Sequence, residues 1–93
     1  MGITQESRRV LVNLYDTLIE NEKATSPEVT INLKDYAKQI NMSKEQLNLC
    51  INVLNNAGYI ICDHPEYEDD DNTTKKIVLT LAAFKVIEGN KSL

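Results

Sequence analysis

The chain has 93 residues, of which 42% are hydrophobic and 26% charged, as is typical of one small soluble domain. Its 14 Asp and Glu residues against 10 Lys and Arg give a formal net charge of −4, which excludes binding of nucleic acid through overall positive charge alone. No apolar run reaches the ~18 residues of a membrane span, and the start of the chain lacks the pattern of a secretory signal. We therefore expect one cytoplasmic domain over residues 1–93, with its folded core at about 4–89 and a tail at 90–93.

The scarce residue types argue against an enzyme or a metalloprotein. Cys50 and Cys62, with the single histidine His64, do not form a zinc-ligand pattern. The three glycines are too scattered to cradle a phosphate, and no Ser-His-Asp arrangement is indicated. We expect no catalytic site, no metal and no cofactor, and we expect the two cysteines to be buried thiols rather than halves of a disulfide.

Apolar spacing predicts a helix at the start of the chain, beginning after Thr4 and ending near Asn21. Its apolar positions are Val10, Leu11, Leu14, Tyr15, Leu18 and Ile19. Residues 29–31 alternate like a very short strand, and a short helix capped by Asn32 is predicted from Leu33 to Ile40.

The next stretch predicts a third helix, from Lys44 to a glycine terminator at Gly58. Ser43 followed three residues later by Gln46 fits a capping box at its start. The expected buried positions are Leu47, Cys50, Ile51, Leu54 and Ala57.

The last third of the chain predicts a hairpin and a terminal helix. Residues 59–62 and 76–79 have strand-like patterns, separated by a polar tip at 65–74. Thr80 is the expected cap of a final helix that ends at Gly89, with Ala83, Phe84, Val86 and Ile87 as its apolar positions. The predicted order is helix, short strand, helix, helix, hairpin, helix, which is an α+β fold.

Three stretches carry a resemblance to a known family: residues 33–43 (LKDYAKQINMS), 54–60 (LNNAGYI) and 79–83 (LTLAA). Their order and spacing resemble the winged helix-turn-helix domain over about residues 4–89, and the layout is loosely similar to that of the YjcQ-type proteins. The small size and the Asn-, Lys- and Ile-rich composition also suggest a phage- or prophage-encoded protein of an AT-rich Gram-positive host.

The resemblance implies a sequence-specific regulator of transcription that places helix 44–57 in the major groove of double-stranded DNA. It also implies a homodimer, because one small module reads few base pairs. The candidate DNA-contact residues are Lys34, Lys38, Ser43, Lys44, Asn48, Asn52, Lys75 and Lys76. Asn48 and Asn52 have the paired donor and acceptor that suit adenine, or they are solvated polar residues on an exposed helix face.

Two features depart from the family pattern and suggest a protein-interaction module instead. Leu49 is apolar on the helix face expected to be exposed, where it is either a partner anchor or a packing contact, or else touches a thymine methyl group. Six acidic residues and no cation lie between positions 63 and 71, which we call the acidic segment. Under this alternative the partner-contact residues are Leu49, Glu68, Asp69, Asp70 and Asp71.

The acidic segment has three interpretations: a solvated loop held clear of DNA, a docking patch for a basic partner, or a divalent-cation loop. The cation-loop interpretation is not supported by the spacing, because the acidic segment lacks the glycine and the terminal glutamate of an EF-hand loop. The rest of the chain has eight Asp and Glu residues and 10 Lys and Arg residues, which gives it a formal charge of +2. The acidity is therefore local, and it argues only against a wing tip that lies close to phosphate.

Overall fold

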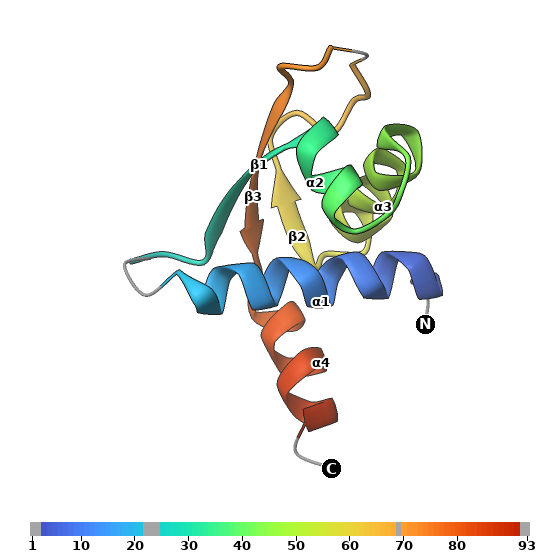
Figure 1. Ribbon diagram of the computed structural model, residues 1–93. Coiled ribbons are helices and arrows are strands. Elements are labelled where there is room, and N and C mark those ends of the chain that lie inside the picture. The colour runs from blue at the N-terminus through green and yellow to red at the C-terminus, as the bar shows by residue number, and fades with distance from the viewer. Residues whose placement is uncertain (1–2, 22–24, 69, 92–93) are drawn as a thin grey trace.

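The protein is an α+β domain, as a computed structural model shows for residues 3–21, 25–68 and 70–91. Within these residues the chain forms, in order, α1 (Gln5–Glu20), β1 (Glu28–Asn32), α2 (Leu33–Gln39), α3 (Lys44–Asn56), β2 (Ile60–Cys62), β3 (Thr74–Leu79) and α4 (Leu81–Lys91). Figure 1 shows α1 lying between α4 on one side and the sheet, α2 and α3 on the other. The predicted order of elements is confirmed.

The three strands form one antiparallel sheet in the order β1-β3-β2, so that β3 is the central strand. Ile77 of β3 lies opposite Val29 on one side and Cys62 on the other. The short strand predicted at 29–31 is longer than expected, because it pairs with β3 from Glu28 to Asn32. The predicted hairpin is confirmed, and no helix in the described part of the chain is long and apolar enough to cross a membrane.

Local side chains determine where three of the helices begin. The Thr4 hydroxyl accepts from Ser7 N at 3.1 Å, the Asn32 amide oxygen from Asp35 N at 2.9 Å, and the Ser43 hydroxyl from Gln46 N at 3.0 Å. Each bond satisfies a backbone donor that has no partner within its helix. These three predicted caps are confirmed.

The ends of α2 and α3 share one geometry, in which a residue with positive φ follows the helix. At α3 this residue is Gly58, with φ 85°, and Tyr59 N donates to Leu54 O at 3.0 Å. At α2 it is Asn41, with φ 60°, and Met42 N donates to Ala37 O at 2.8 Å. Asparagine is one of the few residues other than glycine that tolerates this conformation, so the turn between α2 and α3 depends on Asn41.

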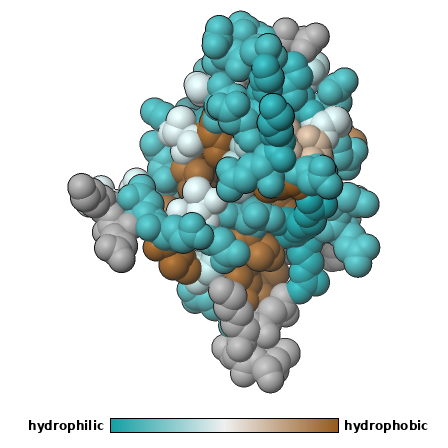
Figure 2. Space-filling view, viewed as in Figure 1, coloured by the Kyte–Doolittle hydropathy of each residue, from teal (hydrophilic) through white to brown (hydrophobic). Residues whose placement is uncertain are grey.

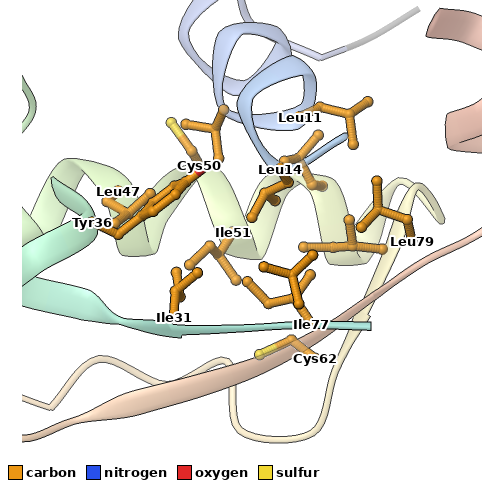
Figure 3. Close-up of a cluster of buried hydrophobic side chains, with 14 of the residues drawn as sticks. Leu11, Leu14, Ile31, Tyr36, Leu47, Cys50, Ile51, Cys62, Ile77 and Leu79 are labelled. Atoms are coloured by element: carbon orange, nitrogen blue, oxygen red, sulfur yellow. The ribbon is translucent and has the colours of Figure 1, made fainter. Parts of the chain in front are cut away.

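The core lies between the helices and one face of the sheet, as Figure 3 shows. Leu14 of α1, Ile51 of α3 and Ile77 of β3 are completely buried within it. Cys50 and Cys62 are buried free thiols, as predicted. Burial of such apolar side chains is the main favourable term in the stability of a domain of this size.

Several predicted details at the ends of helices are wrong. Ile19 and Ala57 are exposed rather than buried. Each lies at the end of its helix, where the buried hydrophobic core no longer covers the helix. The last helix continues through Gly89 to Lys91, so the predicted tail is shorter than residues 90–93, and residues 92–93 lie outside the described residues.

Thr80 directly precedes α4, but its side chain does not have the predicted capping role. Its hydroxyl donates to Gly58 O at 2.7 Å and to Tyr59 O at 3.0 Å. Thr80 N also donates to Tyr59 O, at 3.1 Å. Thr80 therefore joins the start of α4 to the end of α3, which lies more than 20 residues earlier in the chain.

Candidate functional site

The segment between β2 and β3, which the structure describes at residues 63–68 and 70–73, folds back toward the starts of α2 and α3. We call it the β2–β3 loop; it forms the top of the molecule in Figure 1. Its C-terminal end is attached to the start of α2, where Leu33 N donates to Thr73 O at 2.9 Å and the Asn32 amide to Asp71 O at 3.1 Å. Asp71, at the end of the acidic segment, is therefore placed at the start of α2, one of the two helices that the sequence singles out for DNA contact.

Three side chains clamp the other end of the β2–β3 loop through three consecutive carbonyl groups. Asn48 and Asn52 of α3 donate to Pro65 O at 3.0 and 2.7 Å. The Lys75 ammonium group donates to His64 O, and to Glu66 O at 2.7 Å. We call Asn48, Asn52 and Lys75 the loop clamp.

The loop clamp corrects three of the eight candidate DNA contacts. Asn48 is 4% exposed and Lys75 is 2% exposed, so neither side chain is available to a base or a phosphate. Asn52 is partly buried, and its amide nitrogen is bonded to Pro65 O and to Asn48 O. The predicted outward orientation of Asn48 is wrong, because Pro65 of the β2–β3 loop covers it.

The sequence does contain a signal for two members of the clamp. Lys75 shares its strand face with Ile77 and Leu79, because alternate residues of a strand point the same way, and both of these are buried. Asn48 lies one position from Leu47 and three from Ile51, within the wide buried arc of α3. The sequence pattern predicts this strand only from residue 76, whereas β3 begins at Thr74, so the predicted strand does not include Lys75.

Two candidate lysines meet at one carboxylate of the β2–β3 loop. Lys34 Nζ lies 3.2 Å from Asp71 Oδ2, and Lys44 Nζ lies 3.3 Å from Asp71 Oδ1. Hydrogen bonds from Lys34 and then Lys44, reinforced by their positive charges, hold the pKa of the Asp71 carboxyl below its usual value. No sequence pattern indicates these pairs, whose members lie 37 and 27 residues apart.

The remaining candidate DNA contacts are a cap and two exposed lysines. The Ser43 hydroxyl is engaged as the cap of α3. Lys38 on α2 and Lys76 on the outer face of the sheet are both exposed. Lys34, Lys38, Lys44 and Lys76 are thus the candidate lysines whose side chains reach the surface.

The outward face of α3 is acidic, apolar and polar rather than basic. Leu49 is 57% exposed, which confirms its predicted orientation, and Glu45 and Asn56 lie on the same side of the helix. Of the acidic partner candidates Glu68, Asp70 and Asp71 are exposed, whereas Asp69 lies outside the described residues. Figure 2 shows the top of the molecule, over the β2–β3 loop, as a largely hydrophilic surface.

Among the described residues no group of three or more His, Cys, Asp and Glu side chains is placed to hold a metal ion. Comparisons of the chain with protein-family models, with curated proteins and with solved structures returned no match. Among the described residues, the candidate site contains two convergent ammonium groups, those of Lys34 and Lys44, held at one carboxylate of the β2–β3 loop.

Proposed function

We propose that this chain is a winged-helix domain that binds double-stranded DNA, with α2 and α3 as the helix-turn-helix and the β2–β3 hairpin as the wing. The observation that carries the proposal is the convergence of Lys34 and Lys44, which lie in the first turns of α2 and α3 and bind one carboxylate within 3.3 Å. Two ammonium groups that share a carboxylate are also placed to share a phosphate, since both anions present paired oxygens.

In this proposal the phosphate contacts come from Lys34, Lys44 and the exposed Lys38 and Lys76. Phosphate contacts fix the position of a protein on the duplex, whereas base contacts provide sequence specificity. The residues available for base contact are those on the outward face of α3: Leu49 suits a thymine methyl group, and Glu45 suits the amino group of cytosine. Regulation of transcription by a homodimer belongs to the same proposal, because two copies double the number of base pairs read.

Replacing both convergent lysines should weaken DNA binding and reduce its dependence on salt. Contact with four phosphates corresponds to a slope of about −3.6 in log K against log salt, and loss of two contacts reduces it to about −1.8. We expect this change for Lys34→Gln/Lys44→Gln, measured by fluorescence anisotropy with a labelled duplex over a series of salt concentrations.

The matched control is Lys85→Gln, which removes an exposed positive charge from α4, on the other side of α1. It should leave the slope at the wild-type value. Binding that barely changes with salt, or equal slopes for wild type and the double variant, would contradict the phosphate contacts.

A second candidate function is favoured by the exposure of Leu49 on the outward face of α3. Single exposed leucines are common, but a leucine in the middle of an outward helix face is a suitable anchor for a protein partner. In this case the domain is a protein-interaction module, and its binding does not depend on Lys34 and Lys44.

Leu49→Ala should abolish co-purification of such a partner. Ile61→Ala is the matched control, since Ile61 is an apolar residue of β2 that is 55% exposed. Proteins retained by wild type and Ile61→Ala but lost from Leu49→Ala would favour the second function. Identical sets from all three proteins would contradict it.

A further inference from the structure

We infer that the two convergent lysines form a phosphate-binding site which Asp71 of the wing occupies in the free protein, so that the domain carries its own competitor for DNA. This inference rests on the proposed DNA-binding function and adds its regulation. The Asp71 carboxylate stands where a phosphate of the duplex would stand: one oxygen faces Lys34 at 3.2 Å and the other faces Lys44 at 3.3 Å.

Backbone contacts hold Asp71 in this position. Thr73 N donates to Asp70 O at 3.0 Å and Asn72 N to the Asp70 carboxylate at 2.9 Å, which forms a tight turn around Asp71. The Asn32 amide binds Asp71 O at 3.1 Å, and Leu33 N binds Thr73 O at 2.9 Å. The loop is therefore attached beside the lysines by bonds that do not involve the Asp71 carboxylate.

The ion pairs themselves are weak enough to be exchanged. The Asp71 side chain is 62% exposed, and the Lys34 and Lys44 side chains are 48% and 23% exposed. Water and salt screen pairs with this exposure, so that a phosphate brought close by other contacts can replace the carboxylate. The backbone anchor means that the displaced carboxylate stays near the bound phosphate and repels it.

The expected consequence is weaker binding of any duplex that has few other contacts with the domain. A duplex that reaches only the lysine pair has to displace a tethered anion of the same charge. A duplex that also contacts Lys38, Lys76 and the outward face of α3 gains enough binding free energy to do so. The acidic wing then lowers the affinity for every duplex that uses the lysine pair, so that tight binding requires these additional contacts.

Asp71→Asn tests the inference, with Glu68→Gln as the matched control. Both substitutions remove one negative charge from the β2–β3 loop, but only Asp71 bridges Lys34 and Lys44. Asn keeps the size of Asp, and the backbone carbonyl that Asn32 binds remains. We expect Asp71→Asn to bind a mixed-sequence duplex about fivefold more tightly than wild type at low salt, and Glu68→Gln to change affinity less than twofold.

The same substitution in the Lys34→Gln/Lys44→Gln background separates displacement of the carboxylate from general repulsion. If the gain arises from releasing the two lysines from the Asp71 carboxylate, Asp71→Asn in that background has no larger effect than Glu68→Gln. An equal gain from Asp71→Asn and Glu68→Gln, or a gain that persists without the lysines, would overturn the competitor role while leaving DNA binding intact. Absence of duplex binding by wild type and by Asp71→Asn alike would overturn both proposals.

Discussion

Replacing Ile51 with alanine should lower the free energy of unfolding by about 3 kcal/mol, because removal of a fully buried branched side chain loses its transfer free energy and leaves a cavity. Ile51 is completely buried in α3, and Figure 3 places it in the middle of the cluster, between side chains of α1 and of the sheet. A domain of this length has a stability of about 5–14 kcal/mol, so the loss is a large fraction of the total. Urea unfolding followed by circular dichroism measures it.

Leu49→Ala on the same helix is the control for this experiment. It removes an apolar side chain that is 57% exposed, and the expected change is within about 0.5 kcal/mol. A loss of more than 1 kcal/mol would mean that Leu49 packs against part of the protein, such as a second copy of the chain. A small change would show that any loss of partner binding by Leu49→Ala arises from its surface and not from unfolding.

The features of this fold that the sequence predicts are those determined within one turn of helix or one strand. Thr4, Asn32 and Ser43 cap helices three residues away from the donors they bind, and Gly58 ends α3 by its own conformation. Apolar periodicity likewise identifies the core, because a side chain's direction on a helix follows from its position alone.

The candidate site could not be predicted in the same way, because it depends on the path of the β2–β3 loop. The loop brings Pro65 onto Asn48 and Asp71 onto Lys44, contacts that join residues 17 and 27 positions apart. A polar residue on a helix has the same local signature whether it faces water or a folded loop. The sequence therefore identifies the residues with suitable chemistry but not which of them the fold engages internally.

Replacing Lys75 with methionine should destabilise the domain by about 2 kcal/mol, because hydrogen bonds from a charged donor contribute about 1.5–3 kcal/mol and two carbonyl groups lose that donor. Methionine keeps an unbranched apolar stem of similar length in the buried position, so the change is confined to the ammonium group. The carbonyls of His64 and Glu66 are then free to move, and the β2–β3 loop loses one member of its clamp. Urea unfolding, with amide hydrogen exchange across residues 63–73, detects both effects.

Lys76→Met distinguishes this role from a direct contact with DNA. Lys76 is the next residue of β3 and is exposed, so its replacement should leave stability within about 0.5 kcal/mol of wild type and remove at most one phosphate contact. If Lys75 binds phosphate rather than the loop, the two variants behave alike: both keep their stability and both lose DNA affinity. If it is part of the loop clamp, only Lys75→Met unfolds more easily. The affinity of Lys75→Met for duplex should then rise, because a looser loop holds the competing Asp71 carboxylate less firmly against Lys34 and Lys44.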